Sequence, residues 1–466
     1  TDGLAEKRLN YLRGDPADEA TLFRRRNGKL LGDIVNSGVA YSGVPSASIS
    51  ASNYASFYAT NKTRTAAVFV GANDGMLHAF SATSGEELFA YIPSWLGPKL
   101  PALTSPTYAN AHQNFADGTP AVAEAEVGSA WKTVLVAGTG GGGRGVFALD
   151  VTNPASFDAG KVMWEFTQAD DADMGYVIGR PAILKLRTSA PNETAAYKWF
   201  ALVAGGVNSY VADSAGVYGS GKPSLFLLDL SKGAGVSWSL NSNYYKISFP
   251  FDSELSATKA TGMVNFKAAL GLNGEVAQLF AGDLHGKLWK LDFSKFGHSD
   301  WNIGKLSSFN DGNTTPVPLP LYIAKDGSGT VQPITMAPLV AYGPNAQSAF
   351  VLFGTGKYLE VADKSSTQQQ SVYMVYDDGT SVLDSPAATA TSAISGRRRL
   401  QAGTSTAATA STCSGWRRTP RASASASTRW CAAMPCAAAT AAGAATRCRS
   451  RPASAPTVSG WSWAPR

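Results

Sequence analysis

A short glycine-anchored pattern recurs five times along this chain of 466 residues. Each copy has a few apolar residues, a glycine, a polar turn and a second apolar run, as in VFVGANDGMLHAF from Val68 and LFAGDLHGKLWKLDF from Leu279. Such repetition constrains the fold, because each copy is one supersecondary unit that must bury its apolar face against its neighbours. The anchor glycines lie 67 to 77 residues apart, at Gly71, Gly138, Gly205, Gly282 and Gly354.

Each copy has room for four short strands. An apolar run precedes the anchor strand, as in RPAILKL from Arg180 and APLVAY from Ala337, and the equivalents in the first and fourth copies are GDIVNSGVAY from Gly32 and GMVNFKAAL from Gly262. A fourth run can follow, as in ELFAYI from Glu87. Strand-favouring residues divided by Gly, Asn and Asp turns are typical of antiparallel sheets. We therefore predict an all-β fold class, a β-propeller of four-stranded antiparallel blades.

Charged residues divide the chain into parts of different character. The whole chain has a net charge of +6, but from Arg397 onward it contains 11 arginines and no Asp, Glu or Lys, so residues 1–396 have a net charge of −5. A mildly acidic body gives no reason to expect a nucleic-acid partner. We predict an N-terminal lead-in segment at 1–30, a β-propeller with long insertions between its strands at 31–396, and a separate tail at 397–466.

The tail at 397–466 consists almost entirely of Ala, Arg, Ser, Thr, Pro, Gly, Trp and Cys, and it holds all four cysteines of the chain. Two interpretations remain open. The tail is either a disordered, basic, low-complexity segment or a GC-rich coding sequence that is read out of frame. Both interpretations remove the strands that would close the ring, so we predict a propeller that is incomplete at its C-terminal end.

Five segments, in this order along the chain, resemble the C-terminal β-propeller of PilC/PilY-type type IV pilus biogenesis proteins. The resemblance covers about residues 8–399. The segments are RNGKLLGDIVNS from Arg26, VFVGANDGMLHAF from Val68, DADMGYVIGRPAILKL from Asp171, LFAGDLHGKLWKLDF from Leu279 and LFGTGKYLEVAD from Leu352.

The resemblance implies a function that the repeats alone do not. Members of the family are exported proteins of the pilus tip and outer surface, which support pilus extension against retraction and mediate adhesion. We therefore expect a non-enzymatic pilus biogenesis and adhesion factor at the pilus tip, the outer-membrane surface or outside the cell. Its expected partners are the pilus tip with its minor pilins, the pilus assembly machinery and a host-cell receptor. No run of 18 apolar residues occurs, so we expect no transmembrane segment.

The resemblance also points to a calcium loop, which in the family is a run of Asp and Asn before the fourth anchor strand. The matching stretch here is FKAALGLNGEVAQLFAGD from Phe266, which offers only Asn273, Glu275 and Asp283 as side-chain ligands. Calcium takes six to eight oxygens, usually from several carboxylates. We interpret the site as degenerate, with weak calcium binding as the alternative.

A second acidic group lies elsewhere, at Asp170, Asp171 and Asp173. It is either a cation site or a solvated turn, and we favour the turn. Near the N-terminus, Arg13, Gly14 and Asp15 spell the tripeptide that integrins bind. Because a proline and acidic residues follow, a surface turn is expected there. The tripeptide is therefore a candidate adhesion contact, with a plain turn as the alternative.

The main alternative function is a PQQ-type quinoprotein dehydrogenase, whose propeller blades contain similar turns. Such enzymes usually have a vicinal cysteine pair, whereas residues 1–396 contain no cysteine. The glycine run from Gly138 to Gly143 resembles a dinucleotide loop, but an apolar strand is predicted after it where such a site needs a helix. The four histidines show no metal-ligand spacing, and alignment of the repeats places His78 opposite Trp289 on a blade strand, where we expect a packed or half-exposed structural role.

Overall fold

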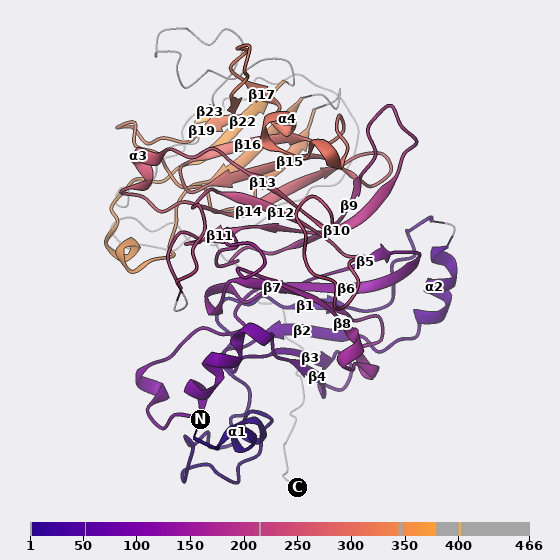
Figure 1. Ribbon diagram of the computed structural model, residues 1–466, viewed down its shortest axis with the longest axis vertical. Coiled ribbons are helices and arrows are strands. Elements are labelled where there is room, and N and C mark those ends of the chain that lie inside the picture. The colour runs from indigo at the N-terminus through magenta and orange to yellow at the C-terminus, as the bar shows by residue number, and fades with distance from the viewer. Residues whose placement is uncertain (1, 52, 214–215, 344–347, 379–399, 402–466) are drawn as a thin grey trace, which may run out of the picture. The chain divides into compact units, whose positions relative to one another are not determined.

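The computed structural model describes residues 2–378 and 400–401, apart from 52, 214–215 and 344–347. The described residues belong to one compact unit that ends at Ala407. Antiparallel strands are its main regular structure, and its helices are short (Figure 1). This confirms the all-β prediction. Except for Leu400 and Gln401, the tail predicted at 397–466 lies outside the described residues, and both interpretations of it stay predictions.

Five sheets follow one another along the chain, and each contains one copy of the repeat. The first sheet contains β1 (Ala40–Ser42), β2 (Ala67–Gly71), β3 (Leu77–Ser81) and β4 (Glu87–Tyr91). The second contains β5 (Ala121–Val127), β6 (Ala130–Gly138), β7 (Gly145–Asp150) and β8 (Val162–Thr167). The third contains β9 (Ala182–Arg187), β10 (Tyr197–Ala204), β12 (Ser224–Asp229) and β13 (Tyr244–Ser248).

The fourth sheet has five strands, β11 (Gly206–Val207), β14 (Gly262–Leu270), β15 (Val276–Asp283), β16 (Lys287–Asp292) and β19 (Tyr322–Ile323). The fifth contains β20 (Leu339–Tyr342), β21 (Ala349–Gly354), β22 (Val372–Asp377) and β23 (Leu400–Gln401). A small pair, β17 (Phe309–Asn310) and β18 (Pro318–Leu319), lies outside these sheets. The α-helices are α1 (Ala5–Leu12), α2 (Tyr54–Asn61), α3 (Ser253–Ser256) and α4 (Ile303–Leu306). The 3-10 turns are η1 (Ser94–Thr104), η2 (Tyr108–Asn110), η3 (Gly140–Gly142), η4 (Pro154–Ser156), η5 (Ala159–Lys161), η6 (His298–Asp300) and η7 (Val361–Ser365).

Each sheet packs face to face on the next one in the chain. In β6, Leu135 and Ala137 contact the first sheet, whereas Val134 and Val136 contact the third. Because side chains alternate between the two faces of a strand, a strand covered on both faces must be apolar at every position. The fully buried β12 (SLFLLD) follows this rule at its four central positions. The four largest core clusters of the described residues each join two consecutive sheets, and none of them joins the first sheet to the fifth.

The five anchor glycines occupy equivalent places, at or next to the ends of β2, β6, β10, β15 and β21; each of these is the second strand of its sheet when the two-residue β11 of the fourth sheet is not counted. A side chain would not fit there. A Cβ atom on Gly71 would lie 2.0 Å from the carbonyl oxygen of Ala116, just before β5, and one on Gly282 would lie 2.2 Å from Ile334, just before β20. At Gly71, Gly138 and Gly282 the chain that leads into the next sheet therefore crosses closely over the glycine, whereas Gly205 is closest to the Ser224 carbonyl of its own sheet.

The predicted first strand of the first copy is wrong over most of its length. GDIVNSGVAY was expected to begin pairing at Gly32, but β1 begins only at Ala40. The backbone N–H and side-chain amide of Asn36 donate to Asp117, and the Ser37 hydroxyl donates to the carbonyl of Gly118. Residues 32–39 thus bind the segment that leads into the second sheet and do not join the first sheet's own ladder.

The lead-in at 1–30 folds back onto η1, next to the first sheet. The backbone N–H of Arg24 donates to Thr104, and the Arg24 Nε atom donates to the carbonyl of Leu103 at 2.8 Å. Arg26 forms a buried ion pair with Glu19 at 2.6 Å, and its guanidinium lies over the ring of Tyr11. These contacts fix α1 and the residues after it beside the first sheet.

Candidate functional site

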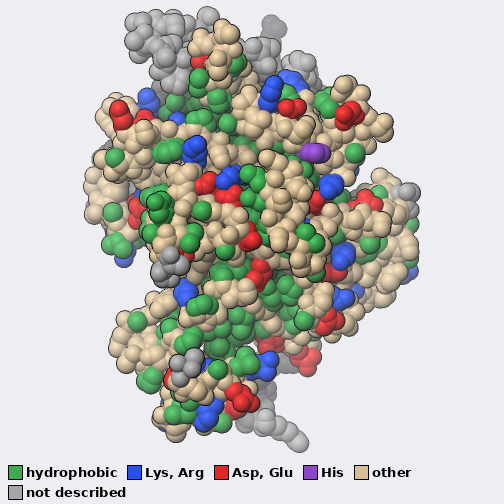
Figure 2. Space-filling view, in the orientation of Figure 1, with side chains coloured by type: hydrophobic (Ala, Val, Ile, Leu, Met, Phe, Trp, Pro, Cys, Tyr) green, Lys and Arg blue, Asp and Glu red, His purple; other side chains and the backbone are tan. Residues whose placement is uncertain are grey.

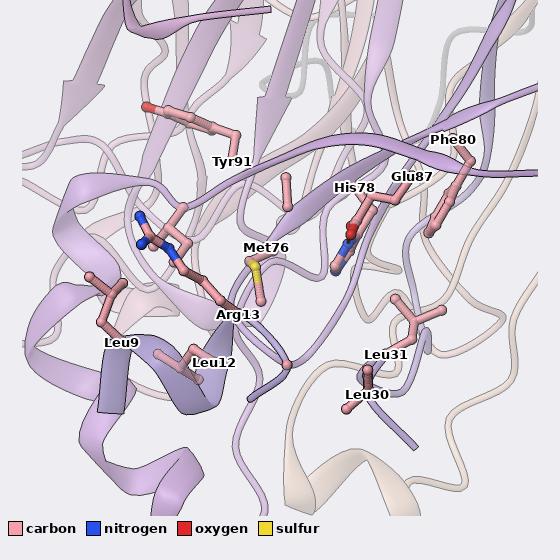
Figure 3. A pocket seen from close by; sticks show the side chains of 13 residues that line it. Leu9, Leu12, Arg13, Leu30, Leu31, Met76, His78, Phe80, Glu87 and Tyr91 are labelled. Atoms are coloured by element: carbon pink, nitrogen blue, oxygen red, sulfur yellow. Dashed lines mark hydrogen bonds and ion pairs between the residues drawn. The ribbon is translucent and has the colours of Figure 1, made fainter. Parts of the chain in front are cut away.

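A cavity of about 600 Å³ lies between the lead-in and the first sheet (Figure 3). Leu9 and Leu12 of α1 line one side of it, and Leu30 and Leu31 line another. Its remaining walls come from the β2–β3 turn and from β3 and β4. Leu9, Leu30 and Leu31 are 41 to 51% exposed, so an apolar surface stays open to solvent here. A concave apolar surface with a few polar groups is the usual form of a binding site. We call it the apolar cavity.

His78 is the charged centre of the apolar cavity. Its Nδ1 atom lies 2.5 Å from Glu87 of β4, and its Nε2 atom lies 3.1 Å from both carboxylate oxygens of Asp74. Carboxylates accept hydrogen bonds only, so contacts at both ring nitrogens favour the imidazolium form of His78. Burial alone would lower the pKa of His78, but the bonds to Asp74 and Glu87 outweigh burial and raise it. The triad ties the turn after β2 to β3 and β4.

The Arg13-Gly14-Asp15 tripeptide lies at the end of α1. Arg13 and Asp15 are exposed, and Gly14 has a φ of 108°, which favours glycine. The Asp15 carboxylate accepts the N–H of Ala17 at 2.9 Å, and its carbonyl accepts a hydrogen bond from Arg26. Arg13 and Gly14 also line the apolar cavity. The tripeptide is thus a turn whose two charged side chains reach solvent.

The three candidate calcium ligands do not lie together. Asn273 and Glu275 belong to the tight turn between β14 and β15, where Glu275 accepts the N–H of Asn273 at 2.9 Å. Asp283 is fully buried at the other end of β15, about 25 Å away at the usual rise of a strand. Its carboxylate accepts N–H groups from His285, Lys287 and the Trp289 ring. Within the described part of the chain, no three His, Cys, Asp or Glu residues form a group that could hold a metal.

The acidic cluster around Asp171 already contains a cation. The Lys246 ammonium lies 2.9 Å from Asp171 and 2.9 Å from Asp173, and the hydroxyl of Tyr244 donates to Asp171. Burial and the nearby Asp171 carboxylate raise the pKa of Tyr244, so this phenol stays protonated. The cluster is an internal ion-pair network between the segment before β9 and strand β13.

The glycine run that resembles a dinucleotide loop leads into a strand. Gly140–Gly142 form a single 3-10 turn, and β7 begins at Gly145, so no helix N-terminus follows the glycines. A pyrophosphate would have no helix dipole to bind. The alignment of His78 with Trp289 is confirmed, since they lie at equivalent points of β3 and β16.

Sequence reasoning missed the partners of His78. Glu87 is nine residues away along the chain, and only the pairing of β3 with β4 brings it into contact. The signal was present, because a His and a Glu on adjacent strands of a hairpin can face each other when the register allows it. The apolar cavity had no signal in the sequence, because its walls come from segments that are far apart in the chain.

Comparison with known proteins gives a consistent result. The family model of the PilY1 beta-propeller domain matches residues 31–411. The type IV pilus biogenesis factor PilY1 homolog of Xylella fastidiosa is 35% identical over 406 residues, which cover 82% of this chain and 25% of that protein. The type IV pilus biogenesis factor PilY1 of Pseudomonas aeruginosa strain PAK is 35% identical over 404 residues, covering 81% and 31%. The chain thus spans about a quarter to a third of these relatives' length.

A solved structure shows the same fold. The crystal structure of the Pseudomonas aeruginosa PilY1 C-terminal domain matches with a TM-score of 0.53 and 31% identity, over 70% of this chain and 60% of that one. Among the described residues, no helix combines the length and apolar character needed to cross a bilayer.

Proposed function

The chain belongs to the PilY1 β-propeller family, and on that premise we propose that it is the propeller part of a type IV pilus biogenesis factor. In this role it supports pilus assembly and extension through contacts, and it catalyses no reaction. One observation carries the proposal: five sheets, each with its anchor glycine on the second strand, lie within the span that the family covers. Since a fold alone does not imply a function, the 35% identity to pilus biogenesis factors supports the specific role.

The chemistry of the apolar cavity supports a role in contact. Two of its titratable groups, His78 and Glu87, are bonded to each other, and His78 is also bonded to Asp74. A general acid or base needs a proton that it can exchange with a substrate near neutral pH. An imidazolium held between two carboxylates is a poor base, because deprotonation would break an ion pair. The open leucines around it are suited to binding an apolar surface.

The family relationship also supports a location and a set of partners. We place the protein outside the cytoplasm, at the pilus tip or the outer-membrane surface. Its partners there are the minor pilins and the pilus assembly machinery, with a host-cell receptor as the adhesion target. These assignments rest on pilus biogenesis as the function of the relatives.

Genetic replacement tests the proposal. In a bacterium whose own pilus biogenesis factor has been deleted, the propeller of that factor is exchanged for residues 31–396 of this chain. We expect the chimera to restore sheared surface pili and twitching motility. The same chimera with Gly71→Ala, which disrupts the joint between the first and second sheets, is the matched control and should fail. A chimera that is exported and folded but leaves the cells without surface pili contradicts the proposal. Turnover of alcohols by the purified chain with pyrroloquinoline quinone and calcium would favour the dehydrogenase alternative.

Adhesion through the tripeptide is a separate part of the proposal. Asp15→Asn removes the carboxylate charge but keeps an oxygen that can accept the N–H of Ala17, so the turn should persist. We expect cells that express integrins to attach at least severalfold less to a surface coated with this variant. Asp18→Asn, on the same segment, is the matched control and should leave attachment unchanged. Equal attachment to wild type and Asp15→Asn would show that the tripeptide is a plain turn.

A further inference from the structure

A second cavity, of about 280 Å³, adjoins the apolar cavity and has a different character. Leu30 and Leu31 line both cavities, so the two share a wall. The second cavity is lined by four cationic side chains of the lead-in and by two aspartates. We call it the basic cavity. Its cations are Arg24, Arg25, Arg26 and Lys29.

The aspartates of the basic cavity already accept hydrogen bonds from neighbouring side chains. Asp33 accepts hydrogen bonds from the Asn73 amide and from His112, whose ring nitrogen lies 3.0 Å away. Asp74 forms the ion pair with His78 and also accepts the N–H of Gly32 at 2.7 Å. The two negative charges of the cavity therefore have partners of their own.

Most of the cations have no such partner. Arg26 is paired with Glu19, whereas the Arg24 guanidinium donates to the carbonyl of Leu103 and lies over the face of the Tyr108 ring. Among the residues that the structure describes, no side-chain oxygen is recorded within hydrogen-bond or ion-pair distance of Arg25 or Lys29, and both are exposed. Three positive charges thus remain uncompensated in one small concavity, on a body whose net charge is −5 over residues 1–396.

The apolar and basic cavities together form one composite surface. Figure 2 shows basic and hydrophobic side chains next to one another over the lower part of the molecule, where Figure 1 places α1. A ligand that fills both cavities must carry a negative charge beside aliphatic groups. The shared Leu30–Leu31 wall means that the charge and the aliphatic groups must lie close together in it.

We propose that the two cavities are one docking site for a peptide segment of a partner protein, in which acidic side chains adjoin aliphatic ones. The acidic side chains enter the basic cavity beside Arg24, Arg25 and Lys29, and the aliphatic ones enter the apolar cavity. Complementary charge favours such a segment over a neutral or basic one, and the apolar wall favours it over a simple polyanion. The inference does not depend on the proposed role in pilus assembly.

Direct binding to the full chain tests this site. The probe is a fluorescein-labelled octapeptide with two glutamates followed by three leucines, and its binding is followed by fluorescence anisotropy. Two matched peptides replace the glutamates by glutamines or the leucines by serines. We expect both replacements to weaken binding about tenfold, which corresponds to roughly 1.4 kcal/mol. We also expect binding to weaken between 50 and 300 mM salt. Equal binding of the glutamine peptide overturns the proposal.

Substitutions in the chain test where the peptide binds. Arg25→Gln with Lys29→Gln removes two cations that have no partner among the described residues, so folding should be unaffected, and binding should weaken about tenfold. Lys305→Gln with Lys364→Gln makes the same change of charge on exposed side chains elsewhere and should leave binding intact. For the apolar wall, Leu31→Ser should weaken binding, and Leu272→Ser, at a fully exposed leucine, should not.

Four further results would overturn the proposal. One is an equal loss of binding in the two charge variants, because attraction would then come from charge in general. Another is no binding of the probe at millimolar concentration by a chain whose thermal unfolding is normal. The third is retention on anionic phosphatidylglycerol vesicles without binding of the peptide, which would assign the surface to a membrane. Competition by inorganic phosphate alone, at concentrations that do not act through ionic strength, would likewise reassign the basic cavity to a free anion.

Discussion

Single residues in this protein gain their properties from the sheet that surrounds them. Asp283 is a clear case, because complete burial raises its pKa to about 6, although N–H groups of Trp289 and Lys287 act in the opposite direction. Folding therefore favours the protonated carboxyl group. The resulting contribution to stability is complete below pH 3.8, the ordinary pKa, and is lost as the pH rises through about 6.

Asp283→Asn tests this pH dependence. The variant keeps an oxygen for the backbone N–H groups but cannot lose a proton. We expect the unfolding free energy of wild type, relative to that of the variant, to fall by about 2 kcal/mol between pH 4 and pH 7. Urea unfolding at several pH values measures it. Other titrating groups are common to both proteins and cancel in the difference, so parallel curves would contradict the raised pKa.

The affinity of the turn before β15 for calcium also depends on single residues. Asn273 and Glu275 supply two side chains, Asp283 lies at the other end of the strand, and Glu275 already accepts the N–H of Asn273. We expect any binding to be weak, with a Kd on the order of 1 mM or above. Titration calorimetry with calcium, with Glu275→Gln as the control, measures it. A micromolar Kd that the control abolishes would show that backbone oxygens complete a real site.

At the scale of the element, the anchor glycine sets how one sheet joins the next. A Cβ atom on Gly71 would lie 2.0 Å from the carbonyl oxygen of Ala116, which belongs to backbone and cannot rotate away. We expect Gly71→Ala to lower the unfolding free energy by at least about 2 kcal/mol. Gly97→Ala is the control, because nothing lies within 4 Å of its Cβ position and its backbone is not left-handed. Equal urea midpoints for the two variants would refute the crossing as the reason for the repeat.

The sequence predicted elements better than it predicted contacts. The glycine spacing located the second strand of every sheet, and the apolar run from Gly262 became β14 with the expected bounds. The strand predicted over residues 32–39 was wrong. Their apolar pattern suits a strand, but Asn36 and Ser37 form hydrogen bonds with the segment that leads into the next sheet and so do not join the ladder of the first. The Asp74–His78–Glu87 triad and the Lys246 network depend on strand register and on chain crossings. Neither of these leaves a local signature in the sequence.

At the scale of the whole molecule, the five sheets differ in how well they are covered. Strands of the second, third and fourth sheets contribute to core clusters on both faces, whereas the described residues cover only one face of the fifth. The burial of β21 alternates accordingly, with Phe350 40% exposed and Val351 fully buried. Lys290 and Asp377 form a buried ion pair that ties β16 to β22 and helps to hold the last sheet.

Hydrogen exchange should reflect this difference in cover. Local opening costs less free energy where few apolar contacts are broken. We therefore expect amides of β21 and β22 to exchange at least tenfold faster than those of β6 and β12. Lys290→Met leaves Asp377 buried without this cation, so it should accelerate exchange in β22 further and leave β6 unchanged. Uniform exchange over all five sheets would mean that the whole array unfolds only as a single cooperative unit.

The crossing of the chain over the anchor glycines Gly71, Gly138 and Gly282 has a consequence for how such a protein can diversify. The joint between two sheets involves only the end of one strand and the few residues that approach it, as at Gly71 and Ala116. Between these joints the chain is free to lengthen. Residues 92–120 and 293–338 accommodate η1, η2, α4 and the β17–β18 pair without disturbing the sheets on either side. The segments between the sheets can therefore change in length and sequence during evolution, and the choice of partner can change with them, while the spacing between sheets stays constant.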